Sequence, residues 1–262
     1  MARYLGTHKV LMSSANYEAE SLAIFAAFTT SPDDTRKGHI NTCVAALKTA
    51  GVWAKIDFLH VYAAANSQAA LINWKNPGTF DGTAVSAPTF TTDRGFTGDG
   101  SADYIDTAYN PSTAGGSFTQ NSAHFSCWNR TNSAQGGFMM GQLSGNHIAP
   151  KYADNNAYYR CNDNAEMAGV AIANPIGHHI ANRSGASARE GYHNGSSITT
   201  SSDASKAVAN ITVFVLAENS GGSPFLPTTK ECAAASAGGS LSGTEASDFY
   251  NALQTYMTAV GA

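Results

Sequence analysis

The stretch PTFTTDRGFTGDGSADYIDT, from Pro88 to Thr107, decides the expected fold of this chain. Its first part predicts a short strand, because threonine and phenylalanine favour extended backbone. A glycine-rich turn follows at Gly98-Asp99-Gly100, and then a second strand that carries Tyr104 and Ile105. Alternation along this second strand predicts that Ile105 faces a core. Short strands joined by tight turns are typical of an all-β domain.

The same pattern continues through the middle of the chain. From Phe80 onward, short alternating runs are separated by turn residues roughly every 8–12 positions, which favours a two-sheet sandwich. The Asn194-Gly195 pair predicts a tight hairpin, because both residues tolerate a positive φ. The strands expected from this pattern are 84–90, 102–106, 122–130, 137–142, 147–152, 157–161, 168–173, 177–183, 189–193, 197–200 and 211–218.

The first third of the chain predicts helices instead. One helix is expected over Tyr17–Phe28. A second is expected to begin at Ser31-Pro32-Asp33-Asp34, with Ser31 as N-cap and Pro32 in the first helical position. An apolar stripe at helical spacing then marks its buried face and comprises Ile40, Cys43, Val44 and Leu47.

Three further segments complete the predicted organisation. Val52–Tyr62 is rich in β-branched and aromatic residues and predicts a strand or an extended segment, and Asn66 predicts the cap of a short helix through Trp74. Ser242 and Glu245 form a capping-box pattern ahead of a C-terminal amphipathic helix. We therefore divide the chain into an N-terminal helical attachment segment, 1–78, and a jelly roll with a C-terminal helix, 79–262.

Composition limits the classes of function that fit. The chain has 262 residues, 13% of them charged, and a net charge of −4, which gives no electrostatic reason to expect nucleic acid as a partner. No basic segment followed by an apolar run stands at its start, and no stretch approaches the roughly 20 apolar residues of a membrane span. We expect synthesis and folding in a cytoplasm without membrane insertion. The four dispersed cysteines predict buried free thiols.

Two later segments have the same character as the opening stretch. They are YHNGSSITT (Tyr192–Thr200) and ITVFVLAENSGGSP (Ile211–Pro224). In order and spacing the three resemble the concanavalin A-like, laminin-G-type jelly roll, and more narrowly the bacteriophage and prophage virion proteins that carry it. The resemblance covers Trp74 to Ala262. It implies a mainly β, concanavalin A-like jelly-roll sandwich flanked by the N-terminal helical segment and the C-terminal amphipathic helix.

The resemblance also implies a biological setting. It points to a virion component of a tailed phage or a phage-like particle such as a gene transfer agent, placed in a tail fibre, baseplate or head spike. The expected partners are other virion proteins, further copies of the chain and a host-surface polysaccharide. The protein would be made and assembled in the bacterial cytoplasm and reside in the virion.

Catalytic patterns are absent from the sequence. Jelly-roll glucanases of this superfamily carry an alternating Glu-x-Asp-x-x-Glu pattern on one strand, and no such pattern occurs here. Asp99, Asp103 and Asp106 cluster in a turn-and-strand context, where carboxylates ordinarily bond the backbone. We therefore expect a non-enzymatic protein with no catalytic residue, no cofactor and no metal. The oxygen-rich loops 99–103 and 154–156 leave calcium open without a defined ligand pattern.

The aromatic residues suggest a binding surface. Trp128 and Arg130 alternate on one predicted strand, and Tyr158 and Tyr159 follow an Asn-rich turn. Exposed aromatic rings stack on sugar rings while polar side chains bond the hydroxyl groups, so we assign these four residues to a glycan site. The alternative is that the aromatics fill the sandwich core. The competing functions are a purely structural decoration or connector protein and, third, a polysaccharide-cleaving enzyme.

Overall fold

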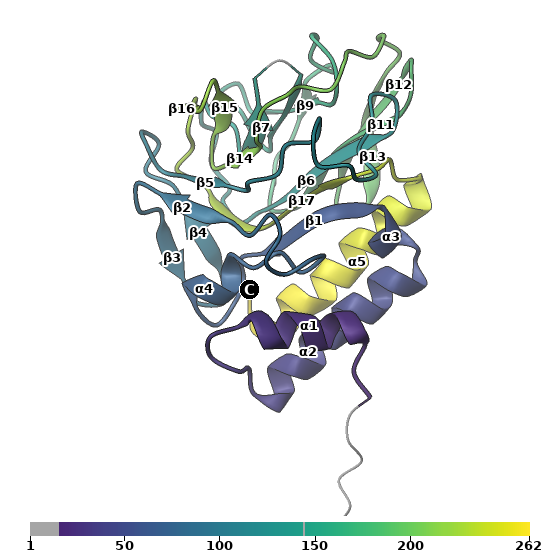
Figure 1. Cartoon of the computed structure of the whole chain (residues 1–262). Helices are drawn as coiled ribbons and strands as arrows, with labels where there is room; N and C mark the ends of the chain where they lie inside the picture. The colour runs from purple at the N-terminus through teal and green to yellow at the C-terminus, as the bar shows by residue number, and fades with distance from the viewer. Residues whose placement is uncertain (1–15, 144) are drawn as a thin grey trace, which may run out of the picture.

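A computed structural model describes residues 16–143 and 145–262 of the chain. It is a sandwich of two large, almost entirely antiparallel sheets, with helices packed on the outer side of one of them (Figure 1). This arrangement confirms the predicted fold class, a mainly β sandwich with helical segments at both ends of the sequence.

The first sheet forms the middle layer of the molecule. Its strands run in the order β13 (Ser196–Ser201), β12 (Ala188–His193), β11 (Gly177–Gly185), β6 (Ala123–Asn129), β17 (Glu231–Gly238), β4 (Gly95–Thr97) and β3 (Thr89–Thr91). Strand β1 (Ile56–Val61) pairs antiparallel with β17 beside β4. The N-terminal third of the chain therefore supplies a strand to the same sheet as the later strands, and the division at residue 78 stays a prediction about function.

The second sheet forms the opposite outer layer. Its order is β10 (Val170–Ala171), β9 (Asn156–Arg160), β8 (Asn146–Ala149), β7 (Met140–Gln142), β14 (Phe214–Val215), β5 (Tyr104–Asp106) and β2 (Thr83–Val85). The hairpin of β15 (Glu218–Ser220) and β16 (Ser223–Phe225) joins it, because β15 runs parallel to β7.

The opening stretch carries the chain from one sheet to the other. Strands β3 and β4 form a hairpin in the first sheet, and after Gly98-Asp99-Gly100 the chain enters β5 in the second. Asp99 Oδ1 accepts hydrogen bonds from the backbone N–H groups of Ser101, Ala102 and Asp103 at 2.8–2.9 Å, so this carboxylate holds the turn. Ile105 is fully buried, as the alternation predicts.

The predicted hairpin at Asn194-Gly195 is also confirmed. These two residues join β12 and β13, which are antiparallel, and both have a positive φ, 50° and 75°. Glycine is needed at the second position, because a Cβ on Gly195 would lie 2.8 Å from the Cα of Ser247. The hairpin therefore lies against the C-terminal helix.

The helices cover the outer side of the first sheet. They are α1 (Ala19–Ala27), α2 (Asp34–Thr49), α3 (Val52–Lys55), α4 (Ser67–Ala70) and α5 (Gly243–Val260). The predicted stripe of α2 packs into one apolar cluster with Phe249 and Leu253 of α5 and with Trp128 of β6. Ser242 and Glu245 cap α5 reciprocally, which confirms the capping box.

Three local predictions about the N-terminal third need correction. Asp33, not Ser31, caps α2, because its side chain accepts the N–H of Arg36 at 2.7 Å. Val52–Tyr62 begins as the short helix α3 before it becomes β1. The helix capped by Asn66 ends at Ala70, because the chain then turns back along β1, where the N–H of Trp74 donates to the carbonyl of Leu59.

Two apolar cores result from this layering. One lies between the sheets and includes Phe125, Met140 and Ile148. The other lies between the first sheet and the helices. The four cysteines are buried free thiols, as predicted, and burial raises the pKa of Cys43, Cys161 and Cys232 to about 12. Both faces of the first sheet are thus inside the protein. In the second sheet the central strands β7, β8 and β14 are buried, and the accessible side chains lie toward its margins, on β2, β9 and β16.

Candidate functional site

The candidate site lies on the outer face of the second sheet, on the opposite side of the molecule from α1, α2 and α5 (Figure 1). Alternation along β9 places its side chains there. Ala157 and Tyr159 are fully buried between the sheets, whereas Tyr158 and Arg160 point outward and are half-buried. The strand therefore presents an aromatic ring and a guanidinium group on one exposed face.

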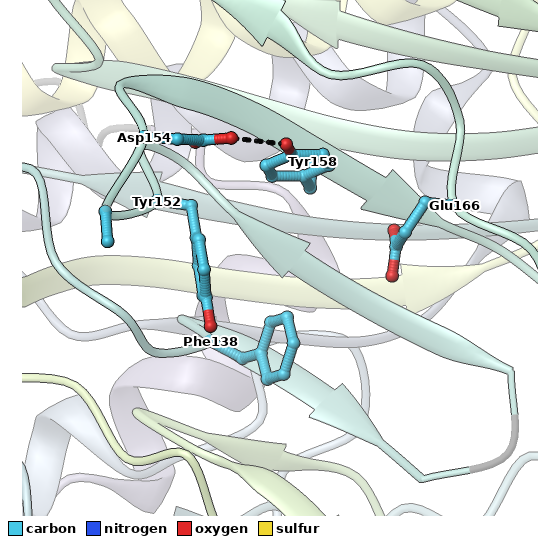
Figure 2. Close-up of a pocket in the computed structure, with 6 residues that line it drawn as sticks. Phe138, Tyr152, Asp154, Tyr158 and Glu166 are labelled. Carbon is cyan, nitrogen blue, oxygen red and sulfur yellow. Dashed lines mark hydrogen bonds between the residues drawn. The ribbon is translucent and has the colours of Figure 1, made fainter.

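A pocket of about 340 Å³ opens beside this strand. Figure 2 shows its lining residues, among them the rings of Phe138, Tyr152 and Tyr158 and the carboxylates of Asp154 and Glu166. The rings of Tyr152 and Tyr158 meet edge to face, 6.0 Å apart at 90°, and Phe138 lies 6.3 Å from Tyr152. The full lining comprises Phe138, Tyr152, Ala153, Asp154, Tyr158 and Glu166. Ligand pockets in proteins typically have this mixture of aromatic walls and a few placed polar groups.

The turn between β8 and β9 fixes the Tyr158 ring. Asp154 accepts the phenolic hydrogen of Tyr158 at 2.6 Å, drawn as a dashed line in Figure 2, and also accepts the backbone N–H of Asn156 at 3.0 Å. The hydrogen bond with Asp154 raises the pKa of Tyr158, and that same bond, together with the Asn156 N–H, lowers the pKa of Asp154. Asp154 therefore stays ionised at neutral pH and orients the ring.

A buried histidine lies behind the residues that line the pocket. The His147 ring stacks on Phe138 with centroids 4.0 Å apart. Its Nε2 lies 2.5 Å from a carboxylate oxygen of Glu166, and its Nδ1 lies 3.4 Å from one of Glu218. Burial acts to lower the pKa of His147, but the two glutamates outweigh burial and raise it above its ordinary value. Arg160 contacts Glu166 at 2.6 Å, so these charges are paired with one another.

Gly141 makes room for this arrangement. The register aligns it with His147 on β8 and with Glu218 on β15. A Cβ at this position would lie 2.7 Å from the Asn146 carbonyl oxygen and 2.7 Å from the Cβ of His147. The absence of a side chain on β7 therefore lets the imidazole lie between the strands that carry Arg160 and Glu218.

Two of the four predicted site residues, Trp128 and Arg130, belong to the first sheet or directly follow one of its strands. Trp128 is only 4% exposed, because α5 covers it, and its ring is stacked between His178 and Tyr250 with both centroids 5.9 Å away. The prediction that Trp128 stacks on a sugar is therefore wrong. Arg130 follows β6, and its Nε lies 3.4 Å from Glu231, which makes it part of a structural ion pair.

The other two predicted residues are neighbours on β9 but face opposite ways. Tyr159 is fully buried between the sheets and its hydroxyl lies 2.7 Å from His179 Nδ1, so its assignment to a ligand surface is also wrong. Tyr158 lines the pocket, and its role in binding stays a prediction. The four residues do not form one site.

Sequence reasoning missed the other walls of the pocket. Tyr152 flanks the Asp154–Asn156 turn, and the alternation of β8 and β9 about this turn was a usable signal. Phe138 precedes β7 and Glu166 lies in the loop before β10, where no periodic pattern marks the direction of a side chain. Only the folded loops bring these two residues to Tyr158.

Neither a side-chain cluster for a metal ion nor a helix able to span a membrane occurs in the described parts of the chain. Within residues 16–143 and 145–262, no group of three or more His, Cys, Asp or Glu side chains is placed to hold a metal ion. Over the same residues, none of the helices has the length and apolar character needed to cross a bilayer.

Comparison with known proteins identifies the fold. No protein-family model matches the sequence, and no curated protein matches it either. The chain is similar to the binding domain of botulinum neurotoxin serotype D, with a TM-score of 0.53 and 11% identity, covering 76% of this chain and 52% of that one. It is also similar to Trypanosoma rangeli sialidase in complex with sialic acid, with a TM-score of 0.51 and 7% identity, covering 83% and 39%.

The chain thus spans about half or less of the length of these solved structures. At such low identity the likeness shows the fold alone. It confirms the mainly β sandwich, and the ligand has to be argued from the surface itself.

Proposed function

We propose that the protein binds a glycan non-covalently through the pocket on the outer face of its second sheet. The observation that carries this proposal is the convergence of Tyr158, Tyr152 and Phe138 around one cavity with polar groups at its rim. Aromatic faces stack on the C–H faces of sugar rings, and the carboxylates and Arg160 bond hydroxyl groups. Because Asp154 holds the Tyr158 ring in place, little side-chain entropy is lost on binding.

The charges at the rim favour an uncharged or amine-bearing sugar. The lining contains two carboxyl groups, Asp154 and Glu166, and no basic side chain, and the nearby Arg160 is already paired with Glu166. An acidic sugar would meet like charge here, which costs affinity. The sialidase to which the chain is similar was solved with sialic acid, and we expect this pocket to select against that acidic ligand.

The resemblance of the sequence to phage and prophage virion proteins supports a biological setting for this binding. We propose that the chain is a non-enzymatic virion component of a tailed phage or phage-like particle, in a fibre, baseplate or head spike, that attaches to a host-surface polysaccharide. Several copies on one particle would convert a weak single contact into firm attachment. A purely structural decoration or connector protein is the alternative, in which the same face contacts another virion protein.

One observation favours a second candidate, a polysaccharide-cleaving enzyme. Asp154 and Glu166 line the same pocket, and glycosidases work with two carboxylates. A general acid needs a raised pKa, however, and the hydrogen bond from Tyr158 lowers that of Asp154. We therefore propose binding without cleavage.

A glycan array tests the proposal. The wild-type protein, Tyr158→Ala and the control Leu22→Ala would be applied to an array of neutral, amino and acidic bacterial glycans, and each spot would be assayed for new reducing ends. Leu22 is a suitable control because it is exposed on α1, in the helical layer. We expect retention on neutral or amino glycans, and Tyr158→Ala should lose about 1–3 kcal/mol of binding, by analogy with base stacking on aromatics.

Leu22→Ala should bind like the wild type. No retention of the wild-type protein on any glycan would favour the structural role instead, and new reducing ends would favour the enzyme.

A further inference from the structure

A second cavity lies in the helical layer, on the other side of the molecule from the candidate pocket (Figure 1). Its volume is about 190 Å³, and its walls come from the connection between α1 and α2, from α4 and from the last turns of α5. Gln68 of α4 fixes these walls, because its side chain accepts the N–H of Thr29 and donates to the carbonyl of Ala27, both at 3.0 Å. Some of the lining residues are exposed, among them Ser31 and Ala65, so the cavity is open to solvent.

The buried wall of this cavity contains a tryptophan whose N–H group is unsatisfied. Trp74 is 1% exposed, and over the described residues its Nε1 has no hydrogen-bond partner. Arg36 also lines the cavity. Its Nη2 contacts Asp93 at 2.8 Å, whereas its buried Nη1 has no partner within the same part of the chain. Buried donors in proteins are nearly always paired. Both of these groups are donors, so the cavity lacks an acceptor.

Two further polar side chains of the lining already have partners. The hydroxyl of Tyr256 donates to the carbonyl of Ala63 at 2.9 Å, and Asn66 Oδ1 accepts the N–H of Ala69 at 2.9 Å. The buried apolar part of the lining includes Ile40 and Ala69. A water molecule takes up about 30 Å³ and needs two to four polar partners. Water would therefore be poorly bonded in most of this volume, and a compact, largely apolar ligand suits it better.

The charges around the cavity favour an uncharged ligand. The guanidinium charge of Arg36 is compensated by Asp93, and Asp33 adds an exposed carboxylate to the lining. An anion would gain little from a cation that is already paired, and Asp33 would repel it. We infer that this cavity is a second binding site, which takes a compact, uncharged and largely apolar molecule whose carbonyl oxygen accepts the N–H of Trp74. The site is separate from the pocket beside β9 and does not depend on glycan binding.

Acetophenone, ethylbenzene and benzoate are suitable probes. They share a benzene ring, which suits walls that contain the rings of Trp74 and Tyr256, and they differ in acceptor and charge. Each would be titrated into the isotope-labelled full chain while NMR follows the indole N–H signals of its three tryptophans, with Trp74→Phe assigning the signal of Trp74. We expect acetophenone to move that signal downfield, because a hydrogen bond deshields the proton. Acetophenone should also bind about tenfold more tightly than ethylbenzene or benzoate, and Trp74→Phe should lose its preference over ethylbenzene.

Trp53→Phe is the matched control. Trp53 is buried in the same apolar cluster as Trp74 but does not line the cavity, so this variant should keep the preference for acetophenone. Should Trp74→Phe not fold, Trp53→Phe and Trp128→Phe assign the Trp74 signal by elimination, and the wild-type titration still decides. Equal affinity for acetophenone and ethylbenzene, tighter binding of benzoate, or an unchanged Trp74 signal with every probe would overturn the inference.

Discussion

Gly141 is structurally important because it has no side chain. Its missing side chain leaves the space in which the Cβ of His147 and the carbonyl of Asn146 approach β7. We expect Gly141→Ala to lower the free energy of unfolding by about 1–3 kcal/mol, because the two strands must separate or the imidazole must move. Urea denaturation would measure this loss, and the array would measure weaker glycan binding.

Gly38→Ala provides a matched control for this prediction. Gly38 lies inside α2, and a Cβ there would meet no atom within 4 Å. Alanine should therefore stabilise the protein by roughly 0.5–1 kcal/mol through its better helix propensity. If Gly141→Ala were as stable as Gly38→Ala, the close approach at His147 would not be a constraint.

Residue-scale prediction from sequence succeeded where the chemistry is local. Asp99 bonds the backbone of its own turn, and Asn194-Gly195 forms the expected hairpin, because both depend on residues close by in the chain. The prediction of a ligand surface failed for Trp128 and Tyr159, because the burial of these two side chains depends on segments that are distant in the sequence. Alternation correctly separates the two faces of β6 and β9, but it does not reveal that α5 covers one face of β6.

At the scale of elements, α5 links the end of the chain to the first sheet. Ser242 Oγ accepts the N–H of Glu245 at 3.3 Å, and Glu245 accepts the N–H of Ser242 at 2.7 Å. We expect Ser242→Ala to cost about 1 kcal/mol of stability, because the N–H of Glu245 loses the hydroxyl that accepts it. Thermal unfolding followed by circular dichroism would measure it.

Thr244→Ala is the control for Ser242→Ala, since Thr244 is exposed in the first turn of α5. This substitution should be neutral or slightly stabilising. Equal stability of the two variants would show that the reciprocal cap adds nothing to helix docking.

Helices and strands with a clear period were predictable from sequence, and the irregular ones were not. The stripe of α2 and the apolar face of α5 repeat every three to four residues, and both helices form as expected. Strands of two or three residues, such as β7, β10 and β14, are too short to show a period, so their limits were predicted less well. The pocket lies among these short elements, and for this reason most of its lining escaped prediction.

At the scale of the whole molecule, buried histidines make the fold sensitive to acid. Burial lowers the pKa of His60 and His124 to about 4 and that of His179 to about 3, and it also lowers the pKa of His178 well below its ordinary value. In the unfolded chain each histidine binds a proton below about pH 6.5. Stability should therefore fall as the pH drops from about 6.5 toward 3–4, because the unfolded state takes up the protons.

The pKa of His147 is shifted in the opposite direction, so its effect on stability has the opposite dependence on pH. Its raised pKa adds stability that is complete below about pH 6.5 and is lost as the pH rises through the raised value. Burial also lowers the pKa of His193, so five histidines with lowered pKa values oppose one with a raised pKa. The urea midpoint should therefore decrease from pH 7 to pH 4.5. A constant midpoint over that range would contradict this account of the buried imidazoles.

His178→Phe tests the origin of the acid effect. Over the described residues neither ring nitrogen of His178 has a hydrogen-bond partner, and the ring packs between Trp128 and Phe249. Phenylalanine keeps that packing and removes the unpaired polar atoms, so the variant should be as stable as the wild type at pH 7 and less sensitive to acid. His124→Phe should be destabilised instead, since it loses a 2.6 Å contact with the Gly239 carbonyl.

The layered architecture determines where a ligand can reach the protein. Helices bury one side of the first sheet, the second sheet buries the other, and the pocket beside β9 opens on the far side of the second sheet. The most direct measurement is amide chemical-shift mapping by NMR of the wild-type protein titrated with the strongest glycan found on the array. We predict shifts confined to the surroundings of the pocket, which are β9, the segment around Phe138 that leads into β7, the 150–155 turn and the loop around Glu166. Shifts centred on α2 and α5, or none at saturating glycan, would contradict the claim.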